Sequence, residues 1–311
     1  MTTAFFTHAD CMDHITPAGH PEQVARLQVI NERLSQDQFA TLSHQTAPMG
    51  TVEQATLTHP ADYVAKIQAA CPAQGHVTLD GDTHVCKDSY TAAMRGVGGI
   101  CAAVDMVMDG TAKNAFCATR PPGHHAETQT PMGFCLFGTV AIGAKYAMEM
   151  RGLSRVAIVD FDVHHGNGTQ DLVWNDPRIM FASSQQMPLW PGTGEASETG
   201  AHDNVINLPL KPYTNGVELM TAYSRDIFPR LAAHKPEMLF ISAGFDAHEN
   251  DPLANLNFST DDFRQITQML CEFAEFNCRG RVVSTLEGGY DLPSLADSVA
   301  AHVKVLMEHA Q

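Results

Sequence analysis

The chain alternates short apolar runs with longer segments of helical periodicity along most of its 311 residues. Short continuous runs of β-branched and apolar residues indicate strands buried on both faces, and apolar residues every three to four positions indicate helices that cover them. This alternation predicts an α/β fold with a parallel sheet between helices. The predicted strands are 114–119, 155–160, 179–183, 238–242 and 281–285. The predicted helices are 90–108, 136–150, 217–233, 261–276 and 292–307, the fourth capped by Ser259 or Thr260.

Residues that can bind a metal ion or transfer a proton follow four of these strands. The segments are RPPGHHAETQTPMGF from residue 120, FDVHHGNGTQD from residue 161, AGFDAHENDP from residue 243 and LEGGYD from residue 286. Ligands of open parallel α/β sheets bind beyond the carboxyl ends of the strands. We therefore expect one functional site at this edge of the sheet.

Composition narrows the class of protein. Hydrophobic residues make up 44% of the chain and charged residues 17%, which is typical of a soluble globular domain. No apolar run approaches the roughly 20 residues of a membrane span, and the N-terminus lacks a basic segment followed by an apolar one. We expect a cytoplasmic protein with no membrane partner.

Charge and cysteine content argue against a nucleic-acid-binding protein and against a disulfide-linked one. The formal net charge of −16 argues against binding to nucleic acid, although it would suit a cationic substrate. Eight scattered cysteines form no CxxC pair, so buried free thiols are expected rather than disulfides.

The segment that follows the strand 155–160 contains a candidate metal site. Asp162 and His164 are alternate residues of an extended segment, so both side chains can face one ion. A carboxylate and a neutral imidazole suit Zn²⁺, and Asp246 is the best candidate for the third ligand. Three protein ligands leave an open position for water. His248 also forms an Asp-x-His pair with Asp246, and it is either a ligand of a second metal or, as we favour, a loop residue.

Candidate acid–base groups lie in two other loops. His124 and His125 can serve as base and acid if each imidazole has its own partner, and Asp160 and Asn167 are suitable partners. A carboxylate raises the basicity of its imidazole more than an amide does, so the two histidines should differ in proton affinity. Tyr290, after two glycines, could donate a hydrogen bond to an oxyanion opposite the metal.

Together these motifs resemble the histone deacetylase family, with its three-layer arginase/deacetylase fold. The similarity covers nearly the whole chain, and Asn167, where class I members carry Asp, makes it similar to class II and to bacterial histone deacetylase-like amidohydrolases. The matching segments, in chain order, are His8–His14, Gly19–Glu22 with Arg26 and Leu27, Arg120–His125, Gly133–Cys135, Asp160–Thr169, Pro191–Gly194, Ala243–Asp246 with Asp251–Leu253, and Glu287–Tyr290.

The resemblance implies one catalytic domain over residues 1–311, with a mostly parallel sheet of about eight strands. It implies a zinc-dependent hydrolase of linear amides that deacylates, chiefly deacetylates, Nε-acyl-lysine of proteins or peptides, or a small acylated amine. Relatives form dimers and tetramers, and the sequence leaves the oligomeric state open.

The resemblance also implies a role for each site residue. Asp162, His164 and Asp246 bind Zn²⁺, His124 and His125 are oriented by Asp160 and Asn167, and Tyr290 polarises the acyl carbonyl. The implied substrate-binding residues are Gly133, Phe134, Trp190, Leu253 and Gly288. A structural K⁺ is implied at Asp160, Asp162, His164, Ser183 and Ser184.

Positions at which the chain departs from or keeps the family pattern bear on the alternative functions. Gln185, Gln186 and Met187 replace a Leu-His pair of many relatives, which puts the rim of the site in doubt. An acetylpolyamine deacetylase is one alternative, but relatives devoted to polyamines carry Glu at the position of Leu253. A ureohydrolase with two Mn²⁺ would carry additional aspartates. A non-enzymatic reader would have lost Tyr290, a zinc ligand or the histidine pair, and this chain keeps all of them.

Overall fold

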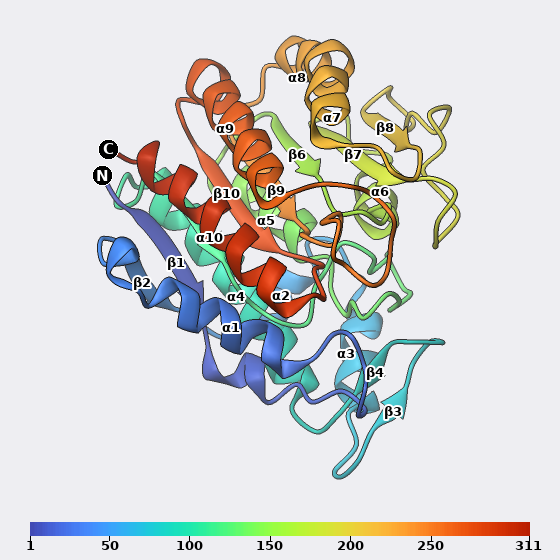
Figure 1. Ribbon diagram of the computed structural model, residues 1–311. Coiled ribbons are helices and arrows are strands. Elements are labelled where there is room, and N and C mark those ends of the chain that lie inside the picture. The colour runs from blue at the N-terminus through green and yellow to red at the C-terminus, as the bar shows by residue number, and fades with distance from the viewer.

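The computed structural model describes residues 1–311 and contains an eight-stranded sheet between two layers of helices (Figure 1). Neighbouring strands pair in parallel throughout, in the order β2-β1-β5-β10-β9-β6-β7-β8. The strands are β1 Thr3–Thr7, β2 Ser43–Thr46, β5 Asn114–Cys117, β6 Val156–Asp160, β7 Ile179–Gln186, β8 Val205–Leu210, β9 Leu239–Ala243 and β10 Val282–Leu286. The predicted α/β fold with about eight strands is confirmed.

Ten α-helices surround this sheet, and a separate hairpin pairs β3 (Val77–Thr78) with β4 (His84–Val85). The helices are α1 Val24–Leu34, α2 Val52–Ala55, α3 Ala61–Ala70, α4 Ser89–Met108, α5 Thr139–Glu149, α6 Asn167–Val173, α7 Gly216–Ala222, α8 Phe228–His234, α9 Thr260–Asn277 and α10 Leu292–Glu308.

Two hydrophobic cores form because successive residues of a strand point to opposite faces of the sheet. In β6, Ala157 and Val159 belong to the core under α1, α9 and α10, whereas Val156 and Ile158 belong to the core under α4 and α5. All four side chains are fully buried. A strand that is apolar at every position is therefore explained by helices on both faces.

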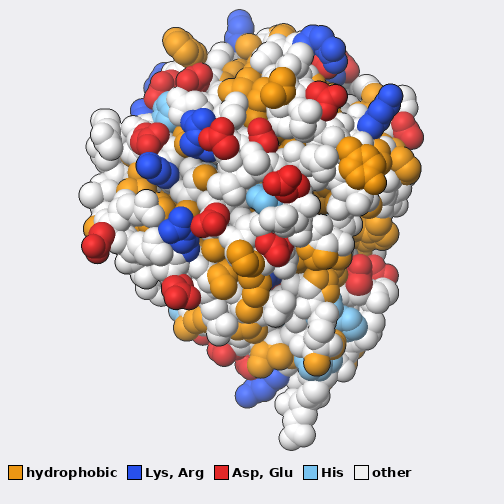
Figure 2. Space-filling view, viewed as in Figure 1, with side chains coloured by type: hydrophobic (Ala, Val, Ile, Leu, Met, Phe, Trp, Pro, Cys, Tyr) orange, Lys and Arg blue, Asp and Glu red, His pale blue; other side chains and the backbone are white.

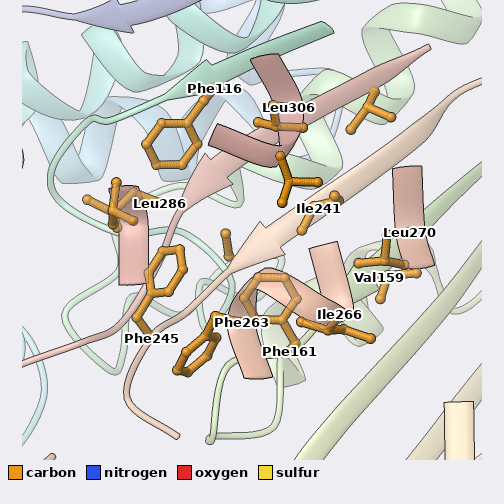
Figure 3. Close-up of a cluster of buried hydrophobic side chains, with 14 of the residues drawn as sticks. Phe116, Val159, Phe161, Ile241, Phe245, Phe263, Ile266, Leu270, Leu286 and Leu306 are labelled. Carbon is orange, nitrogen blue, oxygen red and sulfur yellow. The ribbon is translucent and has the colours of Figure 1, made fainter. Parts of the chain in front are cut away.

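Aromatic and aliphatic side chains fill the first of these cores (Figure 3). Ile266 and Leu270 of α9 and Leu306 of α10 belong to the same cluster as Ile241 of β9 and Phe116 of β5. Burying a side chain of this size contributes about 1.5–3 kcal/mol, so this layer anchors the strands whose ends carry the site.

Charged side chains are scattered over the face of the molecule that carries α1 and α10 (Figure 2). On this face acidic and basic groups are interspersed rather than gathered in one patch (Figure 2). Arg33 of α1 forms an ion pair of 3.1 Å with Asp297 of α10. The excess of acidic residues is therefore not concentrated on this side of the molecule.

Helix α4 has the length and mean hydropathy of a membrane-spanning helix, but 67% of its apolar window is buried inside the fold. It packs against α5 and the strands β1, β5 and β10. The expectation that no apolar segment reaches this length was wrong, because small residues such as Ala and Gly extend the apolar character of α4 where it lies on the sheet.

The apolar pattern identified five of the eight strands and missed β1, β2 and β8. Strand β2 lies at one edge of the sheet and alternates half-buried with exposed residues, so it has no continuous apolar run. Strand β8 lies at the other edge and contains Pro209, a residue that edge strands tolerate because it has no N–H to donate. Both edge strands were thus missed, together with β1, which lies beside β2 inside the sheet and has only five residues.

The predicted helix at 217–233 is interrupted. A π-helical turn at Tyr223–Ile227 separates α7 from α8, and Pro229 stands in the first turn of α8. Proline cannot donate the backbone hydrogen bond of a regular helix. The Ser259 cap of α9 is confirmed, since its hydroxyl accepts from the Asp262 N–H and the Asp262 carboxylate accepts from the Ser259 N–H.

Candidate active site

The predicted site residues converge because β5, β10, β9 and β6 are consecutive neighbours in the sheet. All four strands run in the same direction, so the loops at their carboxyl ends meet at one edge. These are the four strands after which the sequence places Gly, His, Asp and Tyr residues.

Asp162, His164 and Asp246 form a cluster whose ligand atoms all lie within 4.8 Å of one another. His164 Nδ1 is 3.3 Å from Asp162 Oδ1 and 3.1 Å from Asp246 Oδ2. The two carboxylates are 0% and 1% exposed, and neither is paired with Lys or Arg. Two buried carboxylates and one imidazole without a basic partner are a donor set that fits a divalent cation.

Backbone N–H groups orient these carboxylates. Asp162 Oδ2 accepts from Gly288 N at 2.8 Å, and Asp246 Oδ1 accepts from Val163 N at 2.9 Å. A Cβ at Gly288 would lie 2.1 Å from Asp246 Oδ2, so only glycine permits this approach. Gly288 therefore lies beside the metal carboxylates rather than on the wall of the substrate cavity.

His248 lies outside the cluster. Its Nδ1 accepts from the backbone of Asn250 at 3.2 Å, and its ring stacks near Phe263 of α9. The structure therefore favours the interpretation of His248 as a loop residue over a ligand of a second metal.

The histidine pair has the two predicted partners. His124 Nδ1 lies 2.9 Å from Asp160 Oδ2, and His125 Nδ1 lies 2.7 Å from Asn167 Oδ1. The two rings are 3.9 Å apart between centroids. Each imidazole thus has Nδ1 engaged by its partner, and Nε2 of His124 lies 3.7 Å from Asp162 Oδ2.

The two histidines differ in proton affinity, as the sequence predicts. Burial disfavours the charged form of His124, but the carboxylates of Asp162 and Asp160 outweigh it and raise the pKa well above its usual value. Burial lowers the pKa of His125 well below its usual value, and the neighbouring His124 and His164 add to this effect. The surroundings of the two imidazoles therefore shift their pKa values in opposite directions.

Tyr290 lines the cavity, and two charged side chains form hydrogen bonds to the backbone of the turn that carries it. Its backbone N–H donates to Asp251 Oδ2 at 2.7 Å, and the guanidinium of Arg26 donates to the carbonyl of Gly289 at 2.6 Å. The same guanidinium lies 5.0 Å from the centre of the Tyr290 ring. Burial raises the pKa of the phenol well above its usual value, which keeps it in the form that donates a hydrogen bond.

A buried ion network, unassigned at the sequence level, supports Arg26. Glu22 bonds Arg26 at 3.1 Å and Arg120 at 2.5 Å, and all three side chains are fully buried. Residues 22 and 26 stood in the motifs that carry the resemblance, but only the fold gives them a role beneath Tyr290.

A cavity of about 560 Å³ opens above these groups. We call its outer wall the rim, formed by residues 17–21, Gly81, Asp82, His84, Leu189, Trp190 and Leu253. We call the buried metal cluster and histidine pair below it, with their supporting groups, the floor. The predicted residues Gly133, Phe134, Trp190 and Leu253 all line the cavity, which ends on His125, His164 and Tyr290.

The sequence did not indicate residues 17–21 or the β3–β4 hairpin as parts of the rim. Asp82 and His84 belong to that hairpin, and His20 Nε2 lies 3.0 Å from the carbonyl of Asp82. The doubtful Gln185 and Gln186 do not line the cavity, because both are buried and bond neighbouring loops. Short strands and loops carry little periodicity, so only the fold could place this hairpin over the cavity.

Comparisons with known proteins identify the class. The histone deacetylase domain matches residues 20–306. An uncharacterized protein of Synechocystis sp. is 41% identical over 98% of this chain and 99% of its own length. A histone deacetylase-like amidohydrolase of Pseudomonas aeruginosa is 35% identical over 81% of this chain and 67% of its own length. The crystal structure of the HDA15 HD domain has a TM-score of 0.93 at 30% identity, covering 99% of this chain and 88% of that chain.

An α/β fold with an Asp-His-Asp cluster and a histidine pair at the carboxyl edge of its sheet defines a metal-dependent hydrolase. The chain belongs to the histone deacetylase family, as a deacetylase or amidohydrolase.

Proposed function

We propose that this chain removes acyl groups, chiefly acetyl, from Nε-acyl-lysine of proteins or peptides, with Zn²⁺ at Asp162, His164 and Asp246. The observation that carries this proposal is the cavity, which leads between Phe134 and Trp190 to His125, His164 and Tyr290. Aromatic walls suit the four-carbon chain of lysine, and the groups at the end suit an amide. Bound Zn²⁺ supplies polarisation of the carbonyl and acidification of a water molecule.

The histidine pair moves the protons in this proposal. His125 is neutral and has Nε2 free, so it accepts a proton from the attacking water. Asp160 bonds Nδ1 of His124 at 2.9 Å and favours its charged form, which would stabilise the negative charge that develops beside it. The proton then passes from the histidine pair to the leaving amine.

Tyr290 orients and stabilises the acyl oxygen. Its phenol stays protonated, and the turn that carries it is fixed by Asp251 and Arg26. A preorganised donor of this kind stabilises the oxyanion of an acyl-transfer transition state more than it stabilises the substrate carbonyl.

Leu253 favours acyl-lysine over acetylpolyamine as the substrate. Asp82 is the sole carboxylate among the residues that line the cavity, and Leu253 offers no charge to a distal ammonium group. The net charge of −16 favours cationic substrates in general, so an acetylpolyamine is the second candidate.

We also propose a structural K⁺ at Asp160, Asp162, His164, Ser183 and Ser184. Supporting this, Asp160 of β6 is in register with Ser183 of β7, and both are fully buried. The Ser184 hydroxyl lies 3.4 Å from the carbonyl of Asp160. The expected result is a higher melting temperature in KCl than in choline chloride at equal ionic strength, and no difference would contradict the proposal.

A substrate panel tests the proposed function. Acetyl-lysine peptide, longer acyl-lysines, trifluoroacetyl-lysine and N-acetylputrescine are compared with and without a chelator, and bound metals are counted. We expect acetyl-lysine peptide to exceed N-acetylputrescine by at least about tenfold in kcat/KM, a difference of about 1.4 kcal/mol. The reverse preference supports polyamines, two Mn²⁺ per chain supports a ureohydrolase, and no hydrolysis of any substrate rejects the proposal.

A further inference from the structure

The side-chain amide of Asn167 lies between His125 and Glu127. Asn167 Oδ1 is 2.7 Å from His125 Nδ1, and Asn167 Nδ2 is 2.9 Å from Glu127 Oε1 and 3.3 Å from Met132 Sδ. Both N–H bonds of the amide therefore have acceptors on the side away from His125.

The carboxylate of Glu127 distinguishes the two orientations of this amide. If the amide rotated by half a turn, Oδ1 would face the Glu127 carboxylate, and two acceptors would oppose each other. The observed orientation instead gives a hydrogen bond to a charged acceptor, which is stronger than a neutral one. No Lys or Arg pairs with Glu127, and Asn167 Nδ2 is the one protein group that donates to its side chain.

The backbone leaves Asn167 little other freedom. Asn167 begins α6, where the N–H of Thr169 donates to the carbonyl of His124 at 3.0 Å. A Cβ at Gly168 would lie 2.4 Å from the backbone carbon of His125, so the helix start packs directly on the histidine segment. Rotation of the amide is the remaining variable.

We infer that Glu127 is a positioning residue for hydrolysis, because it fixes the Asn167 amide and thereby decides which nitrogen of His125 carries the proton. Asn167 Oδ1 can only accept, so His125 Nδ1 must carry the hydrogen and Nε2 keeps its lone pair toward the cavity. A flipped amide would donate to Nδ1 and move the proton to Nε2, which then could not accept from water. This inference rests on the proposed function.

The kinetic test compares Glu127→Ala with Glu127→Gln. Glutamine keeps an oxygen that accepts from Asn167, so we expect Glu127→Gln to stay within about threefold of the parent kcat. Glu127→Ala should lower kcat by about 10–100-fold, as is typical when an outer hydrogen-bond partner that orients a functional residue is removed. KM should stay within about twofold of the parent. A kcat of Glu127→Ala within twofold of the parent would overturn the inference.

Asp171→Ala is the matched control for loop structure. The Asp171 carboxylate holds the same loop through the N–H and hydroxyl of Thr128, at 2.8 and 2.6 Å, and makes no hydrogen bond to the Asn167 side chain. We expect its kcat to stay within about twofold of the parent. A loss equal to that of Glu127→Ala would assign the effect to the loop rather than to the amide.

A double-mutant cycle with Asn167→Asp isolates the orientation effect. A carboxylate presents an acceptor to His125 whichever way it is turned, so Glu127→Ala should leave kcat unchanged or raise it in the Asn167→Asp background. The same fold loss in both backgrounds would contradict the inference.

Nitrogen-15 spectra of histidine-labelled protein read the tautomer of His125 without substrate, with the signal assigned from a His125→Gln variant. The parent should carry the proton on Nδ1, and Glu127→Ala should shift it toward Nε2. If the parent hydrolyses nothing in the panel, the proposed function fails while this readout still decides the role of Glu127. An unchanged tautomer in Glu127→Ala overturns the inference.

Discussion

The floor and the rim of the cavity are built by different forces. In the floor, Asp162 and Asp246 are 0% and 1% exposed and are fixed by three backbone N–H donors from the two loops that follow β6 and β10. In the rim, Trp190 and Leu253 are 41% and 36% exposed, and Asp82 is the sole carboxylate. Buried charges demand complete partners, whereas exposed apolar groups tolerate exchange, so the floor should determine chemistry and the rim should determine preference.

Removing a metal ligand should give the largest effect. Asp246→Asn weakens the donor set of the floor, and we expect kcat/KM on acetyl-lysine peptide to fall by at least about 10⁴-fold, since metal polarisation is worth several kcal/mol. Metal content measured on the same sample should fall with it. Full activity without stoichiometric metal would disprove the role of the cluster.

Neutralising Glu22 should destabilise the floor without touching substrate. Glu22→Gln leaves Arg120 and Arg26 without their buried carboxylate, and breaking such a pair costs about 3–5 kcal/mol in free energy of unfolding. Urea unfolding followed by circular dichroism measures this. Asp82→Asn in the rim is the control, with an expected change below about 0.5 kcal/mol.

The same carboxylate predicts a pH dependence. Burial would raise the pKa of Glu22, but Arg120 and Arg26 outweigh it and lower the pKa to about 2. Because the unfolded chain binds this proton first, the free energy of unfolding should fall as the pH drops from about 4.5 toward 2. Glu22→Gln should show a shallower decline over this range, and equal slopes for the two proteins would rule out this contribution.

Tyr290→Phe should separate catalysis from binding within the cavity. Loss of one oxyanion donor lowers kcat by about 10²–10³-fold, and KM should change little because the ring is retained. Steady-state kinetics on acetyl-lysine peptide test this expectation. Activity close to that of the parent would exclude Tyr290 as the donor.

A rim substitution should give the smallest effect and change preference rather than chemistry. Leu253→Glu adds a carboxylate at the cavity mouth, and we expect the ratio of kcat/KM for N-acetylputrescine over acetyl-lysine peptide to rise about tenfold, equivalent to about 1.4 kcal/mol. Leu253→Gln controls for loss of the apolar side chain. An equal shift in both variants would show that charge is not the cause.

Much of the floor could be predicted from the sequence because its chemistry is local. Asp162 and His164 are two residues apart. The segments that carry His124, Asp246 and Tyr290 each follow a strand that the apolar pattern predicts. Parallel strands bring such segments to one edge whatever their separation along the chain. The class of enzyme followed from these residues together with the family resemblance.

The tertiary structure alone decided contacts between residues that no local pattern relates. It placed the β3–β4 hairpin over the cavity, set Glu22 beneath the Tyr290 turn through Arg26, and brought Glu127 to the far side of Asn167, 40 residues away. Periodicity reports which face of an element is buried, but it carries no information about which loops meet. Those meetings depend on the packing of the whole sheet and its helices, and they determine the rim and the proton position on His125.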